Sequence, residues 1–377
     1  MKTIVLSLLA WAVRGLLRLR YSISVKGLDE VKKALCYAEA GILFLPNHPS
    51  ELDPVILESL LWNKFHPHPL VTERFYYLKG YRHFLKIVGA FPLPDLQEGG
   101  NAWKKREVER CLDSIFQQLQ KGENFLIYPA GKLKRGAKEE LGGASLVYTL
   151  RQKSPKTKCV KIRTTGLWGS RFSCAFTGTA PLFSEGVKQC LQVLLKNALF
   201  FAPRRKVVIE MEVMEDNFPL ETKKIFNEAL ENWYNKEGEE PLSLVSNVFW
   251  KKEFLAKKAF NEKKEKKEIL VSKQIEEEVI AKLAQIAKVE KQTISRKTHL
   301  TQDLGLDSLD FMHLLLFIEG SYNLEAQDPE KILTLEDLLS SLSSVSNRKK
   351  HSFSYVQGWP KEGLRKRPRP PRGKFLQ

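Results

Sequence analysis

An apolar run that ends in a proline and a polar turn constrains the fold of this chain most. Residues 41–57 read GILFLPNHPSELDPVIL. Residues 42–45 have the length and composition of a buried strand, which Pro46 ends. Asp53 and Pro54 are typical of a helix start, because aspartate is a frequent N-cap and proline fits the first helical turn. The stretch therefore predicts a core strand followed directly by a helix.

The turn between this strand and helix carries a histidine and an aspartate. His48 follows the strand, and Asp53 lies five residues later at the mouth of the helix, where α/β folds place ligands and chemistry. A carboxylate can fix the tautomer of an imidazole and stabilise the imidazolium that forms when the ring takes a proton. A surface histidine beside a helix cap would give the same spacing. Other parts of the sequence are needed to choose between these two interpretations.

Strand and helix patterns alternate after this point, and the alternation predicts an α/β domain over residues 21–245. The expected strands are residues 21–27, 41–46, 70–72, 124–128, 160–164 and 206–213, and the expected helices are residues 54–63, 81–88, 103–120 and 220–233. A basic, glycine-containing loop follows residues 124–128. Its cations are Lys132, Lys134 and Arg135, and Arg163 lies on a later strand. Such side chains can bind phosphate, although a solvated basic loop is the alternative. No metal site is expected, because His66 and His68 are each followed by a proline and have no acidic or cysteine partner nearby.

Charge divides the chain into segments. The whole chain carries a formal net charge of +17. Residues 269–346 hold 7 Lys and Arg against 13 Asp and Glu (−6), residues 347–377 hold 10 against 1 (+9), and residues 1–268 therefore carry +14. Residues 246–268 are lysine-rich and predict a basic linker. Residues 347–377 are basic and proline-rich, which predicts a disordered tail that binds anionic lipid head groups. No recognised nucleic-acid motif accompanies the lysines, so no nucleic-acid partner is expected.

The first residues predict a helix that lies in a membrane surface, over residues 1–20. Their apolar run is too short to span a bilayer, carries Trp11, and is followed by Arg14, Arg18 and Arg20. A cleaved signal peptide and a helix packed inside the domain are the alternatives. The five cysteines form no paired motif and are typical of a reduced, cytosolic protein. The chain is therefore expected as a peripheral protein on the cytoplasmic face of a membrane.

Residues 269–346 predict a second, smaller domain. Apolar residues recur at helical spacing in three stretches, around Val279, Leu314 and Leu338, which indicates a small helical bundle. Between the first two stretches, residues 303–309 read DLGLDSL, with Ser308 expected at a helix start. A lone Asp-Ser-Leu would usually be a helix N-cap. This block, within an acidic helical segment, resembles the acyl carrier proteins, and the resemblance implies 4′-phosphopantetheine on Ser308.

Four blocks of the first domain occur in a recognisable order. They are residues 47–53 (NHPSELD), 88–93 (VGAFPL), 125–131 (FLIYPAG) and 160–168 (VKIRTTGLW). In this order they resemble the motifs of the glycerolipid acyltransferase family, of the lysophosphatidic acid acyltransferase type, over residues 15 to 240. The resemblance implies that His48 is the general base for a glycerol hydroxyl and that Asp53 orients it. Ala130 stands where the family has an acidic residue and Lys132 where it has threonine. The resemblance therefore leaves anion binding to the loop cations and Arg163.

The combined prediction is an α/β acyltransferase domain followed by a small all-α carrier domain. It would transfer a fatty acyl group from a thioester, on acyl carrier protein or acyl-CoA, to the hydroxyl of a lysophospholipid or glycerol phosphate. The expected partners are the membrane surface, a phosphopantetheinyl transferase and a separate acyl-activating ligase. The alternatives are a non-catalytic membrane adaptor that displays an acyl carrier, and an acyl-CoA enzyme with a regulatory carrier. Opposite charge further predicts that the carrier helix near Asp310 and Glu319 docks beside His48.

Overall fold

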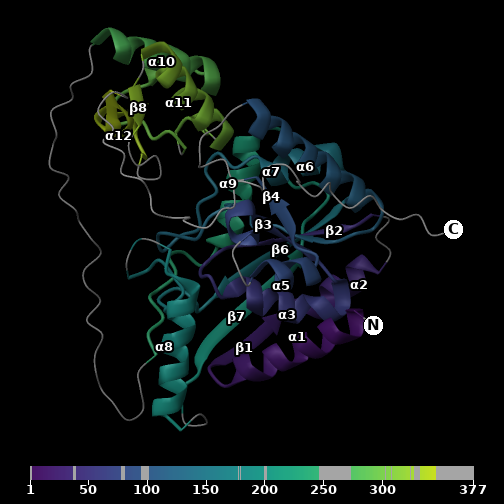
Figure 1. The fold of residues 1–377 in the computed structure, drawn as a ribbon. Coiled ribbons are helices and arrows are strands. Elements are labelled where there is room, and N and C mark those ends of the chain that lie inside the picture. The colour runs from purple at the N-terminus through teal and green to yellow at the C-terminus, as the bar shows by residue number, and fades with distance from the viewer. Residues whose placement is uncertain are drawn as a thin grey trace, which may run out of the picture.

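The computed structural model shows an α/β domain with a smaller helical unit beside it (Figure 1). It describes residues 2–36, 40–77, 81–94, 102–176, 178, 180–198, 202–245, 273–301, 303–306, 308–322, 324–326 and 332–344. The predicted linker (residues 246–268) and tail (residues 347–377) lie outside the described residues.

A mixed sheet forms the centre of the α/β domain. Its seven strands are β1 (Tyr21–Lys26), β2 (Ile42–Pro46), β3 (His68–Thr72), β4 (Phe91–Leu93), β5 (Phe125–Leu126), β6 (Lys158–Thr165) and β7 (Arg205–Val213). They lie in the order β1-β7-β6-β2-β5-β3-β4, and every neighbouring pair is parallel except β6 and β7. β2 therefore lies in the middle of the sheet, with Phe44 opposite Val160 on one side and Leu126 on the other.

Helices cover both faces of the sheet. One face packs against α1 (Lys2–Arg18), α2 (Leu28–Leu35) and α3 (Asp53–Phe65), and the other against α6 (Ala102–Gln120), α7 (Leu146–Lys153) and α9 (Lys223–Tyr234). Along β2, Phe44 faces the first core and Leu43 and Leu45 face the second. Burial on both faces explains why β2 is continuously apolar instead of alternating. The predicted α/β architecture is thus present.

Several element boundaries differ from the sequence prediction. The short helices α4 (Glu73–Tyr76) and α5 (Tyr81–Ile87) lie between β3 and β4, and α8 (Phe183–Lys196) lies between β6 and β7. Neither α2 nor α8 was predicted, although α2 buries Val31 and Leu35 at helical spacing. β5 is shorter than the predicted strand. α3 begins at Asp53 itself and Leu52 is its N-cap, so Asp53 is not the cap that the sequence predicts.

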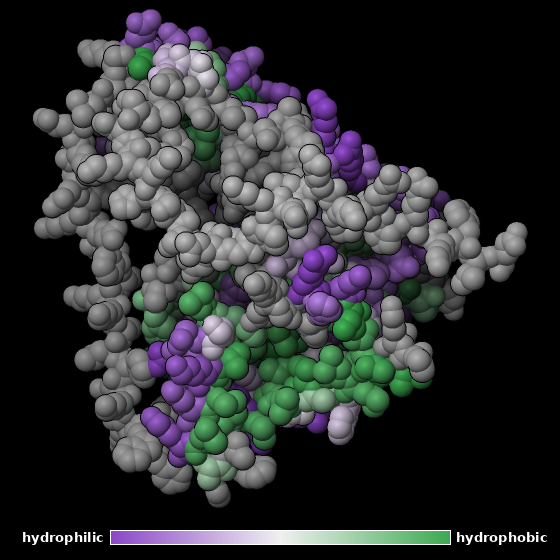
Figure 2. Space-filling model, in the orientation of Figure 1, coloured by the Kyte–Doolittle hydropathy of each residue, from purple (hydrophilic) through white to green (hydrophobic). Residues whose placement is uncertain are grey.

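The N-terminal helix α1 has two apolar sides. Leu6, Ala10 and Leu17 are buried, while Leu8 and Trp11 are 64% and 73% exposed. Figure 2 shows a hydrophobic surface in the region of α1 and its neighbours. Arg14 is not directed at a membrane: its guanidinium donates hydrogen bonds to backbone oxygens of α3, at 2.6 Å to Ser59 and 3.1 Å to Leu60. Among the described residues, no helix is long and apolar enough to cross a membrane.

The helical unit spans the described part of residues 273–344. Its elements are α10 (Lys273–Ala287), the 3-10 turn η1 (Lys291–Thr293), α11 (Ser308–Tyr322), β8 (Leu324–Ala326), α12 (Leu335–Ser341) and β9 (Leu342–Ser344). Val279, Leu314 and Leu338 belong to an apolar cluster formed by this unit's own residues. The antiparallel pair of β8 and β9 corrects the all-α prediction. Short extended segments after α11 and α12 pair with each other, which the helical spacing does not reveal.

Candidate active site

His48 and Asp53 form a hydrogen-bonded pair at the carboxyl edge of the parallel strands. His48 lies two residues beyond β2, and Asp53 opens α3. The imidazole Nδ1 lies 3.2 Å from Asp53 Oδ2. The Asp53 side chain is fully buried, whereas the His48 side chain is 15% exposed. Because a carboxylate accepts hydrogen bonds, Nδ1 carries the proton, and Nε2 is the nitrogen that can accept one from a substrate.

Two further donors fix the Asp53 carboxylate. The Ser50 backbone N–H donates to Oδ2 at 3.1 Å, and the Tyr128 hydroxyl donates to Oδ1 at 2.6 Å. The Tyr128 ring also lies against the His48 ring, with centroids 4.1 Å apart. Burial first, and then the Asp53 charge, raise the pKa of Tyr128 well above its usual value. Tyr128 therefore remains a neutral donor. The sequence analysis did not identify Tyr128 as a site residue, although it is the last residue of the predicted strand of residues 124–128.

Hydrogen bonds to three other segments hold the loop that carries His48. Asn47 joins it to β6: its side chain accepts from the Thr164 N–H at 2.7 Å and donates to the Thr164 oxygen at 3.1 Å. The Lys134 N–H donates to the His48 oxygen at 2.8 Å. On the other side the His48 N–H donates to Glu139 Oε2 at 3.3 Å. These bonds fix the histidine backbone independently of Asp53.

Electrostatics around His48 favour its protonated form. Burial of the ring is the largest single influence and lowers the pKa, but the charge and hydrogen bond of Asp53 act together with the charges of Glu51 and Glu139, so the pKa of His48 is raised above its usual value. An imidazolium at this position is thus stabilised. Glu139 is buried, and desolvation raises its pKa to about 7. The sequence analysis did not predict this second carboxyl group beside His48.

The four predicted anion-binding residues fall into two pairs. Lys132 and Arg135 are exposed in the loop after β5. Lys134 is buried instead: its ammonium lies 2.5 Å from Glu240 and 4.9 Å from the centre of the Trp168 ring.

Arg163 is also buried, and its guanidinium lies 2.8 Å from Glu237 and 3.5 Å from Glu210. Both cations are buried and paired with carboxylates, although the Glu237 side chain itself is exposed, so the structure corrects the expectation that Lys134 and Arg163 present their charges to a ligand. A buried cation needs a carboxylate close by, and these partners come from distant parts of the chain.

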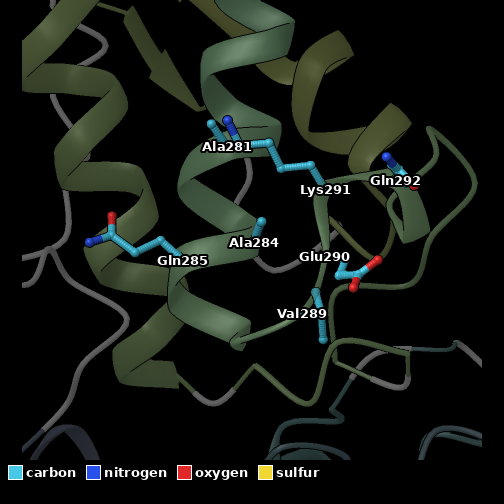
Figure 3. Close-up of a pocket in the computed structure, with 7 residues that line it drawn as sticks. All are labelled: Ala281, Ala284, Gln285, Val289, Glu290, Lys291 and Gln292. Atoms are coloured by element: carbon cyan, nitrogen blue, oxygen red, sulfur yellow. The ribbon is translucent and has the colours of Figure 1, made fainter.

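Ser308 is the first residue of α11, at the position where the carrier resemblance requires a hydroxyl-bearing residue. A groove of about 590 Å³ lies elsewhere on the helical unit, between α10 and η1 (Figure 3). Its lining mixes small apolar residues such as Ala284 with polar ones such as Gln285 and Lys291, and it includes none of the predicted site residues. The described part of the chain holds no group of three or more His, Cys, Asp or Glu side chains able to bind a metal.

Comparison with known proteins defines the class of this enzyme. A family model described as Acyltransferase matches residues 22–163, the stretch that contains His48, Asp53 and Tyr128. This stretch is an acyltransferase domain, and the protein is an acyltransferase. Among solved structures the chain is similar to the 1-acyl-sn-glycerophosphate (LPA) acyltransferase PlsC from Thermotoga maritima, with 12% sequence identity and a TM-score of 0.37. That similarity covers 58% of this chain and 70% of that chain.

Proposed function

We propose that the protein transfers a fatty acyl group from a thioester to the hydroxyl of a lysophospholipid or glycerol phosphate, with His48 as the general base. The observation that carries this proposal is the 3.2 Å contact between His48 Nδ1 and Asp53 Oδ2 inside the acyltransferase domain. A held Nδ1–H leaves Nε2 as a base of fixed orientation, which is what proton abstraction from an alcohol needs.

In the proposed reaction, Nε2 of His48 accepts the hydroxyl proton while the acceptor oxygen attacks the thioester carbonyl carbon. The tetrahedral intermediate then collapses and the carbon–sulfur bond breaks. The imidazolium returns its proton to the departing sulfur, which gives an ester, a thiol and a neutral His48. Asp53 keeps its negative charge throughout and stabilises the imidazolium between the two steps.

The acceptor's phosphate is proposed to bind at Lys132 and Arg135. Both residues are exposed, and they follow β5 at the same edge of the sheet as His48. Lys134 and Arg163 support the site from within through their ion pairs. This division gives separate predictions for the two pairs: the exposed cations affect acceptor binding, and the buried cations affect stability.

The exposed apolar side of α1 is proposed to lie in the cytoplasmic surface of a membrane, where a lysophospholipid would be presented. Ile4, Leu8, Trp11 and Leu16 are 64–73% exposed. Apolar side chains of this kind with Trp are typical of helices that lie in the interface plane.

The acyl donor is proposed to be the helical unit, through 4′-phosphopantetheine attached to Ser308. The residues present fit this group, because a hydroxyl-bearing residue begins a helix of 15 residues, whose N-terminal partial positive charge favours a phosphodiester. When bound, the group supplies the thiol that carries the acyl chain as a thioester. A phosphopantetheinyl transferase and a separate acyl-activating ligase would then be required. Acyl-CoA is the competing donor.

The proposal is tested with the full chain, vesicles that contain lysophosphatidic acid, and either acyl-CoA or acylated carrier as donor. We expect His48→Ala to reduce acyl transfer by about 100-fold or more, since general-base catalysis typically contributes that much. His83→Ala is the matched control, because His83 is exposed on α5. An unchanged rate in His48→Ala, or no acylation from any thioester, would refute the function. Mass spectrometry of the protein from its host tests separately whether Ser308 is modified.

A further inference from the structure

The backbone of the helical unit contacts a pair of glycines in the α/β domain. These glycines, Gly142 and Gly143, precede α7 and are called the glycine turn below. A Cβ atom added at Gly143 would lie 2.1 Å from the Leu306 backbone oxygen, and its three nearest atoms all belong to Gly305 and Leu306. A Cβ added at Gly142 would lie 3.4 Å from Thr301. The segment just before Ser308 is therefore packed so closely on Gly143 that no side chain fits between them.

Helix α9 fixes the shape of the glycine turn. The Asn227 amide donates to the Gly142 and Ala144 oxygens, both at 2.8 Å. Glu231 accepts from the backbone N–H groups of Leu141 at 2.5 Å and Gly142 at 2.9 Å. Asn227 is buried. Side-chain bonds to four backbone groups make this turn a preformed platform.

An ion pair adds a second contact between the same two parts. The Lys223 ammonium on α9 lies 3.7 Å from the Asp310 carboxylate on α11, and Figure 1 shows α11 on the side of the molecule next to α9. Residues 269–346 carry a net charge of −6 and residues 1–268 carry +14. Opposite charges of this size accelerate encounter between the two parts and orient them.

The platform is continuous with the His48 loop. Asn235, which caps α9, accepts from the Glu139 N–H and donates to the Glu139 oxygen, both at 2.9 Å. Glu139 in turn accepts from the His48 N–H. Gly143 is the fourth residue after Glu139, so the two lie within about 14 Å of each other even if the chain between them is extended. The docking contact and the histidine loop therefore rest on the same helix.

We infer that the glycine turn and Lys223 form the site where the helical unit docks with Ser308 close to the active site, so that this chain delivers its own acyl thioester. The inference rests on the proposed function for the identity of the cargo, but the docking itself is independent of it. Glycine is needed at position 143 because the partner's backbone occupies the space of a side chain. Gly143 has a backbone conformation open to any residue, so Gly143→Ala blocks docking without straining the turn.

The docking is tested in the full chain with a zero-length carbodiimide coupler, which joins a lysine to a carboxylate that it touches. We expect a crosslinked peptide pair between Lys223 and Asp310 in the wild type, with a yield that falls at high salt. Gly143→Ala should reduce this yield by tenfold or more although both crosslinked residues remain. Gly136→Ala is the matched control, because a Cβ there meets no atom closer than 4.0 Å. No crosslink in the wild type, or equal yields in both variants, would overturn the docking site.

Acyl transfer then tests the delivery. With the chain's own loaded Ser308 as donor, Gly143→Ala should lose tenfold or more of the rate, whereas transfer from free acyl-CoA should be unchanged. Faster transfer from acyl-CoA in Gly143→Ala would show that the docked unit blocks the active site, and would overturn the delivery role. A crosslink without transfer from any donor would refute the proposed function and leave the docking intact.

Discussion

Replacement of Asp53 by asparagine separates the charge of this residue from its role in orienting His48. Oδ2 of Asp53 accepts hydrogen bonds from His48 Nδ1 and from the Ser50 backbone N–H, at 3.2 and 3.1 Å. In Asp53→Asn the amide oxygen must take this position, because an NH₂ group there would face the Ser50 donor. The Tyr128 hydroxyl can rotate to accept from the amide NH₂ group on the other side. The asparagine thus keeps the productive tautomer of His48 and loses the negative charge.

The size of the effect follows from the bond that loses its charge. A hydrogen bond to a charged group contributes about 1.5–3 kcal/mol, which corresponds to a rate loss of roughly 10- to 150-fold. Asp53→Ala should be more severe, because it also releases His48 and leaves the Ser50 and Tyr128 donors unpaired in a buried place. We expect the kcat values to fall in the order wild type, Asp53→Asn, Asp53→Ala.

The pH dependence gives the decisive measurement. Proton abstraction needs neutral imidazole, so the wild-type kcat/KM should rise with pH through the raised pKa of His48. In Asp53→Asn the carboxylate that raises this pKa is gone and burial remains, so the acidic limb of the profile should move to lower pH. A limb that stays in place, or moves to higher pH, would refute the assignment of Asp53 as the electrostatic partner of His48. So would an Asp53→Asn enzyme as active as the wild type.

Four further substitutions test the surroundings of the pair. Tyr128→Phe removes one of three donors to Asp53, so kcat should fall by up to about tenfold while the melting temperature changes little. A loss of kcat as large as that in Asp53→Ala would contradict this supporting role of Tyr128. Glu139→Gln removes a carboxyl whose pKa of about 7 lies above its usual 4.5. Between these two pH values the folded wild type holds more protons than the unfolded chain, so the stability of the wild type falls as pH rises. The melting temperature of the variant relative to that of the wild type should therefore be higher at pH 8 than at pH 5. Lys134→Met leaves Glu240 without its buried partner and should lower the free energy of unfolding in urea by about 3–5 kcal/mol. Lys132→Ala should change this free energy by less than about 0.5 kcal/mol and should raise the KM of a phosphate-bearing acceptor.

The core strand and the contact between His48 and Asp53 could be predicted from sequence because their signals are local. A strand buried on both faces is a short apolar run, and β2 has this pattern between Gly41 and Asn47. His48 and Asp53 lie five residues apart across one turn, so chain geometry alone keeps them close. The sequence analysis did not predict helix α8. Its Leu191 and Leu195 recur at helical spacing but are exposed, and the helix packs on the domain through few residues, such as Cys190.

The roles of the basic residues could not be predicted, because burial and partner choice are properties of the tertiary structure. Lys132 and Lys134 are two residues apart and chemically identical, yet one is exposed and the other is buried against Glu240, 106 residues later. In the sequence, both lysines belong to the same basic loop. The direction of each side chain depends on where the segment around Glu240 crosses the site, and no local spacing encodes that crossing.

The polar stripe on α9 shows how the same limit extends to the link between the two parts of the chain. Lys223, Asn227, Glu231 and Asn235 follow one another at four-residue spacing, while Phe226, Leu230 and Tyr234 face the core. A stripe of this kind is normally read as a solvent-facing surface. Here each of its members binds another segment: Asp310, the glycine turn twice, and Glu139 beneath His48. Because the four contacts share one helix, α9 links the glycine turn, where the helical unit contacts the α/β domain, to Glu139, which accepts a hydrogen bond from the His48 N–H.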